Sequence, residues 1–197
     1  MPTPRAVVAT RNDHKLRELR EILGSLELVP LPDEVELPPE EGETFADNAL
    51  VKARAAHAAT GLAAIADDSG IEARALDGRP GVRSARYAGP AASDEENLEL
   101  LLRELDETDN RGVAYVCVLA YVDEDGAERL FEGRCEGQLA REPRGSDGFG
   151  YDPAFVPANT GPDDVRTMAE LSPAEKHAIS HRGRAARALA TWLEGGR

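Results

Sequence analysis

The stretch VAYVCVLAYV, residues 113–122, decides the fold because it is an unbroken run of ten apolar residues. A run without polar alternation is typical of a central strand that is buried on both faces of a sheet. Directly after it, Glu124-Asp125-Gly126 predicts a hairpin turn into a second strand over residues 128–139. The chain's two cysteines, Cys117 and Cys135, fall in these strands, and we expect both to be buried core thiols.

The segments on either side of this hairpin alternate between strand and helix patterns. The sequence predicts strands over residues 5–10, 26–31 and 63–66, and helices over 13–23, 44–61, from 93 onward and from 172 to 192. Asp67-Asp68-Ser69-Gly70 is expected to interrupt the third strand, and residues 77–89 are predicted to form a loop rich in glycine and arginine. Strand–helix alternation followed by a hairpin predicts an α/β fold with a mixed sheet and helices on its faces.

Length and charge restrict the class of protein. At 197 residues, 41% of them hydrophobic, the chain can form one large domain with its own core, which excludes a disordered protein. Its 23 basic and 37 acidic residues give a net charge of −14, which argues against binding duplex nucleic acid or an anionic membrane through net charge. No apolar run approaches the roughly 18–20 residues of a membrane span, and the first residues lack a signal-peptide pattern, so we expect a cytoplasmic protein.

Six polar residues between the first predicted strand and helix form the first candidate site: Thr10, Arg11, Asn12, Asp13, His14 and Lys15. The start of a helix presents backbone N–H groups and the positive end of its dipole, which suits phosphate, and a lysine adds charge. The glycines and the Gly-Lys-Ser/Thr ending of a P-loop are absent. Taken alone, these residues fit a solvated helix start equally well.

Carboxylates form the second candidate, Glu40 and Glu41 in a loop and Asp67-Asp68 after an apolar strand. Mg²⁺ prefers oxygen ligands and usually takes one or two carboxylates together with substrate phosphates. In a chain with 37 acidic residues, the two glutamates also fit ordinary surface acids. For Asp67-Asp68, which directly follows Ala-Ile-Ala, a functional site and an acidic turn both stay open.

Two further groups lie toward the C-terminus. The segment Gly148-Phe149-Gly150-Tyr151-Asp152-Pro153 flanks an aromatic ring with glycines, which suits stacking on a nucleobase, with Asp152 accepting from a base edge or ordering the site. Lys176 and Ser180-His181-Arg182 offer cationic donors, and an arginine fork matches the carbonyl and N7 of an oxopurine. Each group also has an ordinary explanation, a turn in the first case and a cationic helix face in the second.

Taken together and in this order, ATRNDHK, TFADNALVKA, ADDSG, PGVRSARYAG, GFGYDP and AEKHAISHRG resemble motifs of the inosine triphosphate pyrophosphatase family. Its members, the dITP/XTP pyrophosphatases, hydrolyse the triphosphates of deaminated purine nucleosides. The resemblance covers residues 7–193. It implies a long, twisted mixed β-sheet flanked by helices, with two lobes and a central cleft in a single domain over residues 1–197, usually in a homodimer.

The resemblance also implies an activity and residue roles. The activity is Mg²⁺-dependent hydrolysis of ITP, dITP and XTP to monophosphate and pyrophosphate, with a small-molecule substrate and neither nucleic acid nor membrane as partner. Asp68 would be the catalytic base, and Glu40 and Asp68 would bind the metal. The substrate-binding residues would be Thr10, Arg11, Asn12, Asp13, His14, Lys15, Lys52, Ser69, Phe149, Gly150, Tyr151, Asp152, Lys176, His181 and Arg182. All three lysines of the chain fall on these positions.

Arg11 departs from the family, which often has glycine at this position. We expect an ordinary backbone here, with the side chain pointing outward. Two other functions would use fewer of these residues. A nucleotide-binding sensor without turnover would not need Asp67-Asp68, and a phosphatase of sugar or pyrimidine nucleotides would not need Arg182.

Overall fold

The computed structural model of the protein describes residues 5–24, 26–161 and 163–195. Its strands are β1 (Arg5–Val8), β2 (Glu27–Pro30), β3 (Ala63–Ala73), β4 (Gly112–Val122), β5 (Glu128–Leu139) and β6 (Phe155–Pro157). Its α-helices are α1 (Asp13–Ile22), α2 (Phe45–Thr60), α3 (Asp94–Glu104), α4 (Pro173–Ile179) and α5 (His181–Glu194).

These six strands form one sheet in the order β2-β1-β3-β4-β5-β6. Strand β1 runs parallel to both of its neighbours, with Val7 opposite Val29 of β2 and Ala64 of β3. Strand β6 pairs antiparallel with the end of β5, where Gly137 lies opposite Pro157. The predicted α/β fold with a mixed sheet is therefore confirmed.

Strand β4 is the central strand that its apolar run predicts. All 11 of its residues are buried, and β5 follows after a tight turn in which the Asp123 N–H donates to the Ala127 carbonyl at 3.0 Å. Gly126 takes a φ of +83° in this turn, a conformation that favours glycine. Cys117 and Cys135 are both buried, as predicted.

Strand β3 differs from its prediction, because it continues through Asp67-Asp68-Ser69-Gly70 to Ala73 instead of being interrupted there. Charged residues are uncommon inside strands, which made this segment look like a turn. In the structure both aspartates are buried, 2% and 5% exposed, and cationic or amide side chains surround them. Tertiary partners therefore override the local preference.

Two other predictions need correction. The C-terminal helix is not continuous from 172 to 192, since Ser180 takes extended backbone (φ −64°, ψ 152°) and separates α4 from α5. Residues 77–89 are not only loop, since they contain the 3₁₀ helix η2 (Gly81–Arg86). The predicted start of α2 is confirmed, because Thr44 and Asp47 form a capping box, and Gly61 ends the helix in the left-handed conformation.

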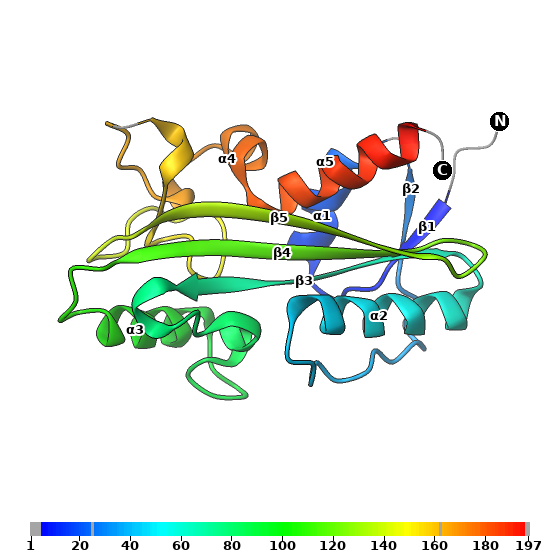
Figure 1. The fold of residues 1–197 in the computed structure, drawn as a ribbon, viewed down its shortest axis with the longest axis horizontal. Helices are drawn as coiled ribbons and strands as arrows, with labels where there is room; N and C mark the ends of the chain where they lie inside the picture. The colour runs from blue at the N-terminus through cyan, green and yellow to red at the C-terminus, as the bar shows by residue number, and fades with distance from the viewer. Residues whose placement is uncertain (1–4, 25, 162, 196–197) are drawn as a thin grey trace. The chain divides into compact units, whose positions relative to one another are not determined.

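The chain divides into two compact units. Unit 1 contains the described residues of 1–68, 117–133 and 182–197. Its strands carry helix α2 on one side and helices α1 and α5 on the other (Figure 1). On the α2 side the contacts are made mostly by small residues, Ala49, Ala53 and Ala56 of the helix against Ala64 and Ala66 of β3.

Unit 2 contains residues 69–116 and the described residues of 134–181. Its core joins Ile71 of β3, Leu101 of α3, Val113 of β4, Leu139 of β5 and Phe155 of β6, all buried. Leu98, Leu101 and Leu105 of the predicted leucine stripe are buried, and Leu102 packs against this core.

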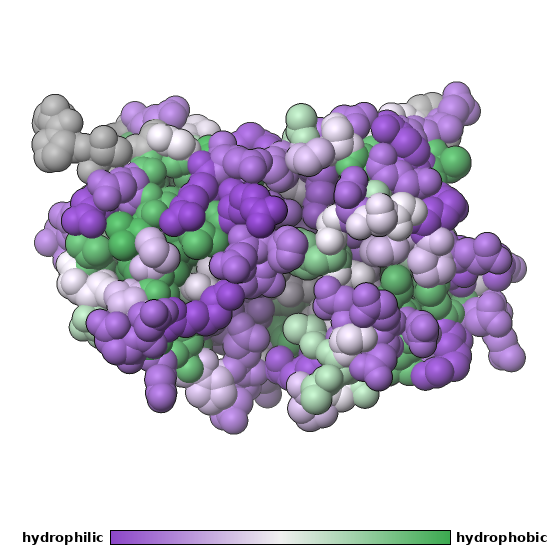
Figure 2. All heavy atoms as spheres, turned by 180° about the vertical axis from the view of Figure 1, so that it is seen from behind, coloured by the Kyte–Doolittle hydropathy of each residue, from purple (hydrophilic) through white to green (hydrophobic). Residues whose placement is uncertain are grey.

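Hydrophilic side chains cover most of the face drawn in Figure 2, and hydrophobic groups show between them. This agrees with a chain in which 30% of the residues are charged. Among the described helices, none combines the length and the apolar composition needed to cross a membrane.

Gly70 leaves no room for a side chain, which generates a stability prediction. A Cβ at Gly70 would lie 2.5 Å from the Gly81 carbonyl oxygen, and Ser84 Oγ accepts from the adjacent Ile71 N–H at 2.9 Å. We expect Gly70→Ala to lower the free energy of unfolding by about 1–3 kcal/mol, measured by urea denaturation. Gly24→Ala is the control, because nothing lies within 4 Å of a Cβ there. Equal stability of the two variants would contradict the prediction.

Candidate active site

Asp67 and Asp68 are adjacent on β3, so their side chains leave the strand on opposite faces. Asp67 points to the same side as Ala63 and Ile65, whose core includes α1 and α5. Asp68 points to the side of Ala66, whose core includes α2. The continuous strand therefore sends the two acids into different surroundings of unit 1.

Asp67 is the centre of a buried ion-pair network. Its Oδ2 accepts from Arg182 Nη2 at 3.0 Å and Nε at 3.2 Å, and lies 3.1 Å from Lys15 Nζ. Arg182 Nη1 in turn donates to Glu18 Oε2 of α1 at 2.6 Å. Burial alone would raise the pKa of Asp67, but Lys15, Arg182 and Lys52 together hold it well below its ordinary value. Asp67 is therefore an ionised structural group and a poor proton acceptor.

This network gives Arg182 two acidic partners that the sequence did not predict. The Arg182 side chain is among the largest that are fully buried, and its guanidinium is directed at Asp67 and Glu18. An arginine offers a planar fork of donors that matches carboxylates in this way. Arg182 therefore supports Asp67, and its contact with the base stays a prediction.

Asp68 belongs to a second cluster, on the α2 side of the strands. Asn48 Nδ2 donates to Asp68 Oδ2 at 2.9 Å, and Asn48 Oδ1 accepts from the Gly42 N–H at 2.8 Å. Burial raises the pKa of Asp68, and the charge of Glu40 raises it further, while Lys52 and Asn48 act in the opposite direction. Asp68 thus holds a proton more readily than an ordinary aspartate.

Lys52 joins the two clusters of unit 1. Its ammonium donates to the Asp67 carbonyl oxygen at 2.7 Å and to the Glu40 carboxylate. Burial alone would lower the pKa of Lys52, but Asp67 and Glu40 raise it above its ordinary value. Lys52 therefore stays charged at neutral pH although it is only 6% exposed.

The predicted phosphate loop, residues 10–15, is held by its own side chains. Thr10 Oγ1 accepts from the Asn12 N–H at 3.1 Å. Asn12 caps α1, accepting from the N–H groups of His14 at 2.9 Å and Lys15 at 3.2 Å. The helix begins at Asp13 as predicted, but two of the N–H groups expected to face a phosphate are bonded within the protein.

Arg11 has the ordinary backbone that we expect, since Asp77 is the one non-glycine residue with positive φ among the residues described. Its side chain does not simply point into solvent. The guanidinium bonds to backbone carbonyls of residues 31–35, at the start of the loop that carries Glu40.

The predicted base-binding residues gather in unit 2 around Asp152. Asp152, 3% exposed, accepts from Tyr115 Oη at 3.1 Å, from the Phe149 N–H at 3.0 Å and from Lys176 Nζ at 2.8 Å. The Lys176 ammonium also lies 4.9 Å from the centroid of the Phe149 ring. Of the two roles that the sequence left open for Asp152, the structure supports the one that orders the site.

The other predicted residues of unit 2 have partners of their own. Tyr115 and His181 stack at a centroid distance of 4.7 Å, and Tyr151 Oη donates to the Ser84 carbonyl at 2.8 Å. The Gly150 N–H donates to Asp94 at 2.8 Å. Ser69, half-buried, follows Asp68 directly along β3.

Sequence reasoning did not identify Glu18, Asn48 and Tyr115. Asn48 could have been found from the helical spacing of the sequence. It lies on the same face of α2 as Lys52 and three alanines, and a polar residue on such an apolar face indicates a function. The sequence gives no such indication for Glu18 or Tyr115. Glu18 resembles any acidic residue of an exposed helix, and Tyr115 resembles any aromatic residue of a central strand.

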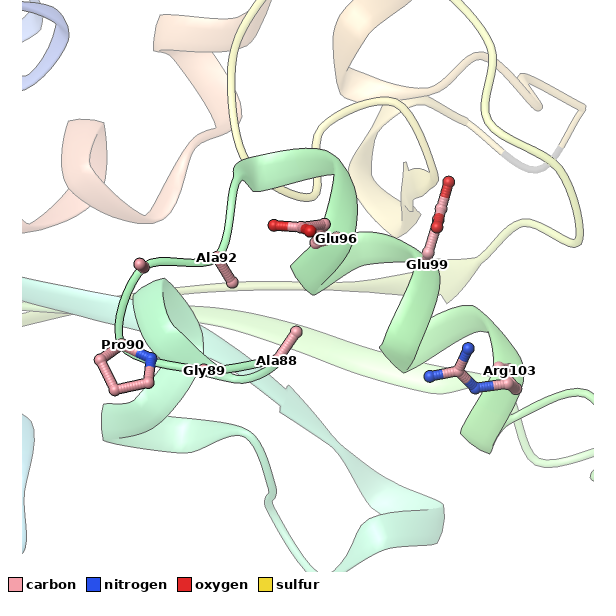
Figure 3. Close-up of a pocket in the computed structure, with 8 residues that line it drawn as sticks. Ala88, Gly89, Pro90, Ala92, Glu96, Glu99 and Arg103 are labelled. Carbon is pink, nitrogen blue, oxygen red and sulfur yellow. The ribbon is translucent and has the colours of Figure 1, made fainter.

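A separate pocket of about 480 Å³ lies in unit 2, lined by the 88–92 loop and by Glu96, Glu99 and Arg103 of α3 (Figure 3). None of the predicted catalytic, metal-binding or substrate-binding residues lines it, although Ala88 and Gly89 belong to the PGVRSARYAG motif. Across the described ranges, no group of three or more His, Cys, Asp or Glu side chains forms a metal cage. Glu40 and Asp68 are only two carboxylates. Two are enough for a cation such as Mg²⁺ when the phosphates of a bound substrate supply further oxygen ligands.

The sequence matches the model of one protein family over most of its length. The Ham1 family model matches residues 6–192. The chain therefore belongs to the Ham1 family.

The chain is also similar to individual proteins over nearly its whole length. A protein from Frankia alni named dITP/XTP pyrophosphatase is 52% identical over 96% of both chains. One of the same name from Mycobacterium tuberculosis H37Rv is 52% identical over 91% of this chain and 90% of that one. A solved structure of a HAM1 protein from Coxiella burnetii has a TM-score of 0.88 and 42% identity, covering 98% of this chain and 100% of that one.

The Asp67 network generates a stability prediction. We expect Arg182→Met to lower the free energy of unfolding by about 3–5 kcal/mol, because it removes a main partner of a buried carboxylate. Arg54→Met is the control, since Arg54 pairs with Glu128 at the surface and such pairs contribute about 0–1 kcal/mol. Urea denaturation compares the two variants. Similar losses would show that Arg182 is not the support of Asp67.

Proposed function

We propose that this chain hydrolyses dITP, ITP and XTP to the monophosphate and pyrophosphate, so that deaminated purines are removed from the nucleotide pool. The substrate class rests on the relatives named dITP/XTP pyrophosphatase, which match at 52% identity over nearly the whole chain. The chemistry rests on unit 1, where Asp68 and Glu40 lie beside the buried cation Lys52.

Asp68 suits the removal of a proton from water. Before a cation binds, burial and Glu40 raise its pKa, and a carboxylate with a higher pKa is a stronger general base. Asn48 bonds to one carboxylate oxygen and so fixes the orientation of the group. Asp67, which is stabilised as an anion, cannot serve this purpose equally well.

The same carboxylates fit a divalent cation. The charge of Glu40 raises the pKa of Asp68, so the two carboxylates are close enough to repel each other. The single positive charge of Lys52 does not balance both of them. We propose Glu40 and Asp68 as the ligands of Mg²⁺, which when bound would neutralise phosphate charge at the reacting end of the substrate. Lys15 and Lys52, both fixed by Asp67, supply further positive charge for the triphosphate.

Unit 2 supplies groups of the kind that hold a purine. The Phe149 ring offers a face for stacking, with Lys176 and Asp152 fixing its loop. We propose this group as the base-binding part, with His181 on Tyr115 beside it. From the family resemblance we also propose that the protein acts as a homodimer in the cytoplasm.

A substrate screen tests the proposal. With purified protein we expect turnover of dITP, ITP and XTP at least tenfold above that of dATP, because adenine presents an amino donor where these bases present a carbonyl. Omitting Mg²⁺ and adding EDTA should abolish turnover. A sensor would bind these nucleotides without turnover, and a pyrimidine-nucleotide phosphatase would prefer dUTP.

The position of attack follows from the products. With ITP as the substrate, attack of water at the α-phosphorus gives IMP and pyrophosphate in equal amounts. In labelled water, ¹⁸O then enters the phosphate of IMP. IDP with labelled orthophosphate would mean attack at the γ-phosphorus, and the proposed reaction would be wrong.

The proposed base generates a second prediction. We expect Asp68→Asn to lower kcat for dITP by roughly 10²–10⁴ at saturating Mg²⁺, because the amide cannot take the proton of water. Glu41→Gln is the matched control, since Glu41 is an exposed acid next to Glu40. Circular dichroism checks that both variants are folded. Asp68→Asn with activity within a few-fold of the control would exclude Asp68 as the base.

A further inference from the structure

The Arg11 side chain ties two loops of unit 1 together. Nη1 donates to the Leu31 carbonyl at 2.9 Å, and Nη2 donates to the carbonyls of Pro32 at 2.7 Å and Val35 at 2.9 Å. Nη2 is also 3.3 Å from the carbonyl of Asp33. One guanidinium thus gathers carbonyls from a segment about 20 residues further along the chain.

That segment begins the loop that carries Glu40. Between Pro30 at the end of β2 and Phe45 at the start of α2, the chain has neither helix nor strand. Backbone carbonyls in such a loop need partners from elsewhere, and the loop holds its shape only where those partners fix it.

Three side chains fix this loop, one from the predicted phosphate loop and two from helix α2. Arg11 holds its start, Lys52 holds the Glu40 carboxylate, and Asn48 holds the Gly42 N–H. Lys52 and Asn48 also bond to Asp67 and Asp68. Arg11 is the one of the three that comes from the predicted phosphate loop.

We propose that Arg11 is a positioning residue, which clamps the 31–35 segment so that Glu40 is held in place for the cation. The proposal rests on the proposed function, in which Glu40 binds Mg²⁺. Arginine suits this task because its planar fork presents several donors in fixed directions, whereas a lysine ammonium is a single point of charge.

The competing explanation is that Arg11 supplies charge to the substrate. Its ion pair with Asp33, at 3.6 Å and with Asp33 fully exposed, adds little to the clamp. A charge role predicts that lysine replaces arginine without loss. A clamp role predicts that it does not.

Hydrogen exchange of the protein without substrate or metal tests the clamp directly. We expect Arg11→Ala to accelerate exchange of amides in residues 33–43 by roughly tenfold, while α2 is unchanged, because charge-assisted bonds that restrain the loop are lost. Arg11→Lys should exchange nearly as fast as Arg11→Ala. Arg17→Ala is the matched control, since Arg17 is an exposed arginine of α1, and it should exchange like the wild type.

Kinetics test the consequence for Glu40. We expect Arg11→Ala and Arg11→Lys to raise the half-saturating Mg²⁺ concentration by roughly 3–10-fold, with the KM for dITP at saturating Mg²⁺ within about twofold of wild type. Should Arg11→Ala fail to fold, Arg11→Lys carries both measurements.

Unchanged exchange in residues 33–43, or full rescue by Arg11→Lys, would overturn the proposal. So would a raised KM for dITP with an unchanged Mg²⁺ requirement. If the wild-type protein turns over no nucleotide, the proposed function fails, but the exchange experiment still decides whether Arg11 is a clamp.

Discussion

An ionised carboxylate in the interior of unit 1, that of Asp67, is the group on which the rest of the site depends. A buried charge is costly unless cations and hydrogen bonds surround it. Here Arg182 and Lys15 bond to the carboxylate, and Lys52 bonds to the carbonyl of the same residue. The need to balance this one charge therefore fixes side chains from α5, α1 and α2. Two of these cations, Lys15 and Lys52, are also proposed to bind the triphosphate. One buried acid therefore sets the positions of both lysines.

The alternation of side chains along a β-strand separates this supporting acid from Asp68, the proposed base. Because Asp68 is the next residue on β3, it faces the opposite side, where α2 supplies an amide and an ammonium but no guanidinium. The pKa of Asp67 is lowered and that of Asp68 is raised, although the two residues are neighbours in sequence. Two adjacent aspartates thus acquire different chemistry from the faces on which they lie.

Local patterns predicted much of this fold. The apolar run of β4, the hairpin and the caps of α2 are decided by residues close in sequence, and all were confirmed. The continuation of β3 through Asp67-Asp68 was not predictable in this way. It depends on Arg182, 115 residues away, and Glu18 lies 164 residues from that same arginine. For the same reason the bonds from Arg182 to Asp67 and Glu18 were not predicted, since the sequence neighbours of Arg182 do not indicate either acid. The order of the motifs indicated candidate site residues, and the structure shows which of them are buried among other polar groups and which are exposed.

The alanines between α2 and β3 have a consequence for how this enzyme can evolve. Ala49, Ala53 and Ala56 have small side chains where the helix packs on the sheet, and Asn48 and Lys52 lie on the same buried helical face. Asn48 has a short side chain, so its 2.9 Å bond to Asp68 exists only at this spacing. A larger core residue would push the helix outward and lengthen that bond before it unfolded the protein. Selection for catalysis therefore acts on these methyl groups as well. In a screen of variants for activity, substitutions of these alanines would lower activity as substitutions of active-site residues do, although none of the alanines is a catalytic group.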